Sequence, residues 1–108
     1  ILADPALQGR FVFMMTHYAA RLEDGSPDSK LHGLHNADDF LEICQQIPNG
    51  ALLCGHIHRC YRTPLSGLSV DLYCAGSATK DHREGFWLFD IENGQCRARQ
   101  GCFDPVNG

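Results

Sequence analysis

The sequence predicts an α/β fold in which one βαβ unit is followed by antiparallel strands. Two short apolar runs, at 11–15 and 51–54, enclose a segment whose apolar residues recur at helical spacing. Further on, Asn93-Gly94 separates two segments of alternating character, which is a strong signal for a β-hairpin. With 108 residues, the chain is expected to form one domain over 1–108.

The first strand is expected at 11–16, because a continuous apolar run is typical of a strand buried on both faces. The polar, turn-rich segment 18–36 reads as a long loop, and such loops are often functional. The helix is expected to begin after Asn36, a good N-cap, and to end before Pro48. Its predicted buried stripe consists of Phe40, Ile43, Cys44 and Ile47. The second strand, 51–54, follows.

The rest of the chain reads as two antiparallel pairs of strands. The expected strands are 59–63 and 68–75, joined by the turn 64–67, and then 86–91 and 95–102, joined by Asn93-Gly94. Arg97 and Arg99 alternate with apolar residues, so both are expected to face water. Trp87 and Phe89 share one face of their strand and are expected to lie in the core.

Composition narrows the choice of partners and compartment. A net charge of −4 gives no basic surface, so no nucleic-acid partner is expected. No apolar run approaches the roughly 18 residues that cross a bilayer, so no membrane partner is expected. The six cysteines form no CxxC pair and mostly sit in apolar runs, which favours reduced thiols and a cytoplasmic location. Cys96 and Cys102 form the pair to check for oxidation.

The strongest functional signal is the tetrapeptide Gly55-His56-Ile57-His58, which directly follows the strand 51–54. His17 likewise follows the first strand. Parallel strands of a βαβ unit end at the same edge of the sheet, so the three imidazoles are expected to converge there. Neutral imidazole is a good ligand for zinc, manganese or iron. The sequence therefore predicts a metal site.

The local geometry of the tetrapeptide can be predicted further. If it is extended, His56 and His58 point the same way with Cα atoms about 6.6 Å apart, which suits two ions better than one. Gly55 lacks a side chain, and this is expected to let the backbone turn beneath the site. A single zinc held by Cys54, His56, His58 and Cys60 is disfavoured, because one strand spreads these side chains over roughly 20 Å.

These residues resemble the C-terminal part of the calcineurin-like metallophosphoesterases. The resemblance starts with Thr16-His17 after an apolar strand, continues through a helix to 52–58, and includes the later strand 73–78. It covers nearly the whole chain, and it implies the C-terminal half of a metallophosphoesterase α/β sandwich. It also implies hydrolysis of a phosphodiester or phosphomonoester, with a small phosphate ester as substrate.

By this resemblance, His17 and His56 bind one ion and His58 binds the other, with two divalent ions (Mn, Fe or Zn) in the complete domain. His32 and His35 lie in the long loop, which borders the substrate pocket in the resembling family. The other interpretation of this pair is that both are solvent-exposed loop histidines. No catalytic residue is assigned, because the general acid is expected in an N-terminal half that this chain lacks.

The family's other signatures are Asp-x-His, Gly-Asp and Gly-Asn-His, and none occurs in this sequence. Since the chain also opens on Ile1 with residues that read like the end of a helix, it is expected to be part of a longer protein. A processed N-terminus is the alternative. The isolated chain is therefore expected to have little or no phosphoesterase activity, and to self-associate through an exposed sheet edge.

Two other functions remain open from the sequence. One is a non-catalytic interaction or structural module of the same fold. The other is a small mononuclear metal-binding domain, complete in itself, which would bind one ion tightly and fold as it does so. A serine nucleophile is not supported, because Ser26 lacks the strand–turn–helix context of a nucleophile elbow.

Overall fold

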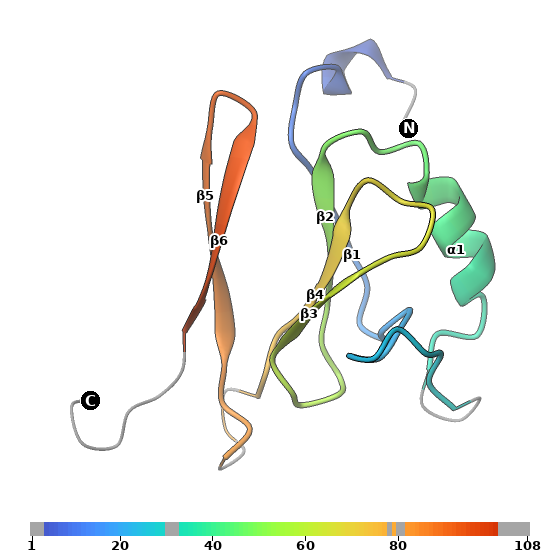
Figure 1. Cartoon of the computed structure of the whole chain (residues 1–108), viewed down its shortest axis with the longest axis vertical. Helices are drawn as coiled ribbons and strands as arrows, with labels where there is room; N and C mark the ends of the chain where they lie inside the picture. The colour runs from blue at the N-terminus through green and yellow to red at the C-terminus, as the bar shows by residue number, and fades with distance from the viewer. Residues whose placement is uncertain (1–3, 30–32, 78, 80–81, 102–108) are drawn as a thin grey trace.

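The computed structural model describes residues 4–29, 33–77, 79 and 82–101, and Figure 1 shows the arrangement of their helices and strands. In chain order the elements are η1 (Pro5–Leu7), β1 (Val12–Met15), α1 (Ala37–Cys44), β2 (Gly50–Cys54), β3 (Tyr61–Pro64), β4 (Asp71–Cys74), β5 (Phe86–Glu92) and β6 (Gln95–Gly101). The mixed α/β class predicted from the sequence is confirmed.

Four strands form one sheet in the order β1-β2-β4-β3. The strands β1 and β2 are parallel, with Met14 opposite Leu52, which confirms the predicted βαβ unit. β4 inserts between β2 and β3, parallel to β2 and antiparallel to β3. β1 and β2 therefore end at the same edge of the sheet, where ligands of α/β proteins usually bind.

The sheet lies between the helix and a separate hairpin of β5 and β6, with α1 on one side and the hairpin on the other (Figure 1). Side chains of the sheet alternate between these two layers, as the pleat of a strand requires. On the helix side, Leu52 and Leu72 join Cys44 and Ile47 in the buried core. On the hairpin side, Tyr73 makes ring contacts with Trp87 and Phe89.

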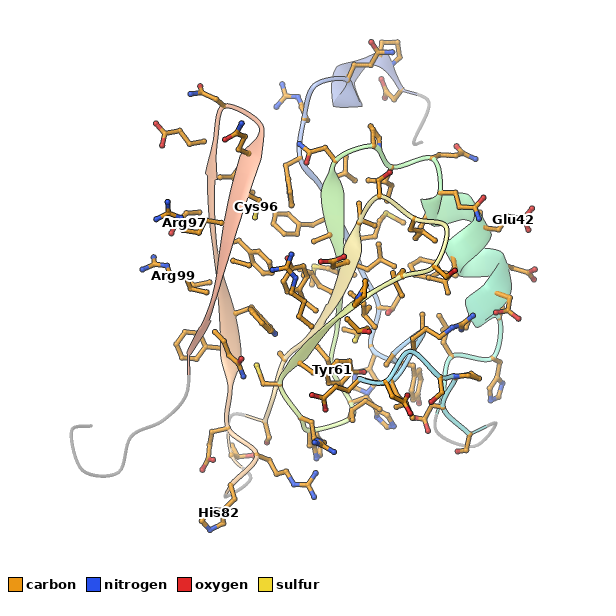
Figure 2. The ribbon with its side chains drawn as sticks, viewed as in Figure 1. Glu42, Tyr61, His82, Cys96, Arg97 and Arg99 are labelled. Atoms are coloured by element: carbon orange, nitrogen blue, oxygen red, sulfur yellow. The ribbon has the colours of Figure 1, made fainter. Side chains whose placement is uncertain are left out.

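The hairpin matches its sequence signal. Asn93 and Gly94 have φ of 53° and 76°, and two consecutive left-handed residues form the turn that suits the twist of a two-residue hairpin. The expected exposure of Arg97 and Arg99 is confirmed, and Figure 2 shows both pointing away from the sheet. Cys96, from the same strand, points toward the sheet and is half-buried.

Two predictions about burial are wrong. β1 is an edge strand with Phe13 36% and Met15 77% exposed, although a strand buried on both faces was predicted. Its apolar run reads the same in an edge strand, because composition does not reveal how many neighbours a strand has. In α1, Ile43 is 52% exposed and Leu41 takes its place in the core, beside Cys44.

Within the described ranges, no helix is long and apolar enough to cross a membrane. Cys44, Cys54, Cys74 and Cys96 are free thiols. Cys102, the predicted oxidation partner of Cys96, lies outside the described residues.

Candidate metal centre

Backbone hydrogen bonds carry the parallel pairing of β1 and β2 past the ends of both strands. Thr16 donates to the Leu53 carbonyl at 2.9 Å, and Gly55 donates to the His17 carbonyl at 3.1 Å. These two bonds place His17 beside the start of the Gly-His-x-His segment. The backbone hydrogen bonds between the two strands therefore bring these two histidines to the same edge.

The side chains of His17 and His56 face each other at this edge. Nε2 of His17 lies 3.2 Å from Nδ1 of His56, and the two ring centroids are 5.0 Å apart. Two nitrogen ligands bound to one ion at about 2.0–2.1 Å, with a near-tetrahedral angle between them, lie roughly 3.3 Å apart. The observed separation therefore fits two ligands of a single ion, and it equally permits a hydrogen bond between two neutral imidazoles.

Tyr18 completes a cluster of three rings. Its ring centroid lies 4.6 Å from that of His56 and 5.0 Å from that of His17. Sequence reasoning did not single out this tyrosine. The available signal was its position directly after His17, which gives it the same sheet edge.

The Gly-His-x-His segment is a tight turn, so the extended conformation considered for it is wrong. Ile57 donates to the Gly55 carbonyl at 2.8 Å, and His56 between them has φ of 69°. This is a γ-turn of the rare type with a positive φ. His58 also has a positive φ, of 60°. Residues two apart in such a turn do not share a direction, so the spacing argument for a two-ion site no longer applies.

His58 lines a hollow that neither His17 nor His56 lines. This hollow measures about 390 Å³ and is walled by polar side chains, among them Arg59, His82 and Glu84. Among the residues that the structure describes, no three His, Cys, Asp or Glu side chains gather into a group that could hold a metal ion. The structure thus brings together His17 and His56, and the assignment of His58 to a second ion stays a prediction.

The predicted substrate-binding histidines are placed only in part. His35 lines a hollow of about 530 Å³ at the N-terminal end of α1, which also includes Arg21 and Asp38, an ion pair at 2.6 Å. Neither His17 nor His56 lines that hollow. His32 lies outside the described residues. A substrate role for these two residues remains a prediction.

The structure does not support the expectation that a glycine is needed at position 55 because the backbone turns there. A side-chain carbon added at this glycine would meet no atom within 4 Å, and its φ is not positive. The positive φ falls instead on His56, one residue later. The turn beneath the site therefore strains a histidine and leaves the glycine relaxed.

Two buried thiols and a phenol lie under this edge of the sheet. Cys54 is paired in register with Cys74, and both are buried. The interaction between the two neighbouring thiols raises the pKa of Cys54 and lowers that of Cys74. Burial raises the pKa of Tyr61, whose hydroxyl donates to the Arg21 carbonyl at 2.8 Å. At neutral pH, Cys54 and Tyr61 remain protonated.

No protein-family model, no curated protein and no solved structure matches this chain. The interpretation of the site therefore depends on its own geometry. Its main features are the two facing histidines at the ends of parallel strands and the aromatic ring that touches both.

Proposed function

We propose that this chain supplies histidine ligands to the metal centre of a phosphoesterase that hydrolyses phosphomonoesters or phosphodiesters. The observation that carries the proposal is the 3.2 Å separation between Nε2 of His17 and Nδ1 of His56. The location at the carboxyl ends of two parallel strands supports it, as does the resemblance to the calcineurin-like metallophosphoesterases.

Each residue of the pair has a definite task in this proposal. His17 and His56 would hold one divalent ion between their facing nitrogens, each in its neutral form. Such an ion supplies a water of lowered pKa and a positive charge that stabilises the phosphoryl group. Because both ligands are neutral, they leave the ion's charge uncompensated and available to an anionic substrate. His17 is exposed and His56 half-buried, so a ligand can reach them from solvent.

A second candidate is the mononuclear metal-binding domain, and one observation favours it. The facing nitrogens of His17 and His56 lie 3.2 Å apart, whereas His58 lines a hollow that neither of them lines. Affinity of the metal-loaded protein for a phosphate group separates the two candidates. One ion per chain, without any affinity of the loaded protein for a phosphate analogue, would favour the mononuclear domain.

The metal centre is tested by isothermal titration of Zn²⁺ into the 108-residue protein. We expect His17→Ala and His56→Asn each to weaken binding by roughly tenfold or more, because one of two converging ligands is lost. Asparagine is chosen at position 56 because it tolerates the left-handed backbone there. His82→Asn is the matched control, since His82 is an exposed histidine that also has a positive φ. Unchanged affinity in the His17→Ala, His56→Asn double variant would refute the site.

The phosphoesterase part of the proposal needs its own measurement. Phenylphosphonate, a phosphomonoester analogue that is not hydrolysed, is titrated into the zinc-loaded and the metal-free protein. We expect binding only to the loaded protein, and loss of that binding in His17→Ala. Equal binding with and without zinc would contradict the proposal, because recognition would then not involve the ion.

A further inference from the structure

We infer that Tyr18 is a positioning residue, whose ring holds His17 and His56 in the orientation that binds a single ion. The inference rests on the proposed metal centre and adds a residue to it. Each of the three rings touches the other two, with centroids 4.6–5.0 Å apart. Tyr18 meets His17 at 78° and His56 at 65°, both edge-to-face contacts of the kind that aromatic rings prefer.

The backbone around Tyr18 fixes where its ring can lie. Its carbonyl accepts a hydrogen bond from Oγ1 of Thr16 at 2.8 Å, which closes a tight bend after β1. The next two residues, Ala19 and Ala20, are each 1% exposed and anchor the chain in the core. Tyr18 itself is 41% exposed, and its ring lies against the two imidazoles at the surface.

The two histidines need such a support. Metal-binding histidines usually donate their second ring nitrogen to a carboxylate or a carbonyl, which fixes the orientation of the ring. In the described part of the chain, the only hydrogen bond of either imidazole is the one between Nε2 of His17 and Nδ1 of His56. The ring of Tyr18 contacts both imidazoles and can restrict their rotation.

Three variants test this role. Tyr18→Ala removes the ring, Tyr18→Phe keeps the ring and removes the hydroxyl, and Phe86→Ala removes an aromatic side chain that is 55% exposed on the hairpin. The readouts are the affinity for Zn²⁺, the visible absorption spectrum of bound Co²⁺, and the nuclear Overhauser contacts between the imidazoles of His17 and His56 in the metal-free protein. Circular dichroism verifies that each variant is folded.

We expect Tyr18→Ala to weaken Zn²⁺ binding by roughly tenfold, the lower range for residues that orient ligands. It should also alter the Co²⁺ spectrum and reduce the contacts between the two imidazoles. Tyr18→Phe and Phe86→Ala should behave like the wild type. If Tyr18→Ala leaves all three readouts unchanged, or if Tyr18→Phe is as impaired as Tyr18→Ala, the positioning role of the ring is refuted.

The failure of this inference can be told apart from the failure of the metal centre. If the wild type binds no metal, the proposed function is refuted, while the contacts between imidazoles still report whether the tyrosine positions them. If the wild type binds Zn²⁺ and Tyr18→Ala binds it equally well with intact imidazole contacts, the metal centre is supported and the positioning role of Tyr18 is refuted.

Discussion

His56 combines a costly backbone conformation with a side chain that has a specific partner. Its φ of 69° is a region that residues with a Cβ atom avoid, while its Nδ1 lies 3.2 Å from Nε2 of His17. Strained residues of this kind persist where the surrounding structure holds them in place, and they cluster at functional sites. The strain at His56 therefore agrees with a ligand-binding role for the turn.

Replacement of His56 separates the effect of its positive φ on stability from the contribution of its imidazole to Zn²⁺ binding. We expect His56→Gly to be more stable than His56→Ala by about 1 kcal/mol, because only glycine adopts this φ without a Cβ penalty. Both variants should lose Zn²⁺ affinity. Urea denaturation monitored by circular dichroism measures the difference, and equal stability of the two variants would argue against a strained turn.

The pH dependence of stability should report on Tyr61. Burial raises the pKa of this phenol above its ordinary value near 10, so the folded state keeps the proton at a pH where the unfolded state releases it. Its contribution to stability is complete below about pH 10 and is lost as the pH rises further. We expect Tyr61→Phe to be less stable than the wild type at pH 8 by about 1 kcal/mol, the value of one hydrogen bond.

Between pH 8 and pH 11 the same variant should lose less stability than the wild type, since it has no phenol to ionise at position 61. Urea denaturation at both pH values gives the comparison. If the free energies of unfolding of the wild type and of Tyr61→Phe fall in parallel over this range, the phenol titrates alike in the folded and unfolded states.

The sequence could predict the approach of His17 and His56 because it follows from one rule of sheet topology. Parallel strands joined by a helix end at one edge, which brings His17 and His56 together whatever the local details. His58 could not be placed, because its direction depends on two positive φ values that no rule assigns to histidines. The contacts of Tyr18 depend on a hydrogen bond from Thr16 to its carbonyl, which composition and periodicity do not reveal.

At the scale of elements, strand periodicity and turn chemistry predicted the hairpin well, and burial was harder to predict. The alternation in 86–101 and the Asn93-Gly94 turn gave β5 and β6 within one residue of their observed ends. For β1, the five apolar residues 11–15 predicted burial on both faces, whereas the strand lies at an edge. Neighbours in a sheet are set by contacts distant in sequence, which local patterns do not encode.

Gly55 and Gly94 should respond differently to replacement by alanine. Gly94 has φ of 76° in the hairpin turn, and its carbonyl accepts a hydrogen bond from the side chain of Asn49. We expect Gly94→Ala to lower the free energy of unfolding by about 1 kcal/mol. Gly55→Ala should be neutral or raise it by up to about 1 kcal/mol, because its φ is not positive and space for a Cβ is open.

Thermal and urea denaturation of the two variants provide the measurement, with the wild type as reference. A Gly55→Ala variant that is destabilised more than Gly94→Ala would show that the backbone near the histidines needs glycine after all, contrary to the observed turn.

At the scale of the whole molecule, the two edges of the four-stranded sheet differ in their protection. The edge strand β3 carries Arg62 and Pro64, both of which discourage pairing with another strand. The edge strand β1 is Val-Phe-Met-Met and carries neither a charge nor a proline. With Phe13 36% and Met15 77% exposed, this edge is the part of the sheet most suited to contact another chain.

The 108-residue protein should therefore self-associate through β1. Sedimentation velocity is expected to show a dimer or larger species for the wild type and a shift toward monomer for Met15→Lys, because a lysine on a sheet edge opposes pairing. Ile43→Lys is the matched control, since Ile43 is also an exposed apolar residue but lies on α1. A monomeric wild type, or equal effects of the two lysines, would contradict association through this edge.

The indole of Trp87 joins two layers of the molecule, and this has a practical consequence. Its Nε1 donates to the carbonyl of Cys74 at 2.9 Å, and its ring contacts Tyr73, so the hairpin is fastened to β4 through this side chain. The sequence contains one tryptophan, so the tryptophan fluorescence of the protein reports on this contact between the hairpin and β4. If the emission maximum shifts at a lower urea concentration than the far-ultraviolet circular dichroism changes, the hairpin separates from β4 before the secondary structure of the molecule unfolds.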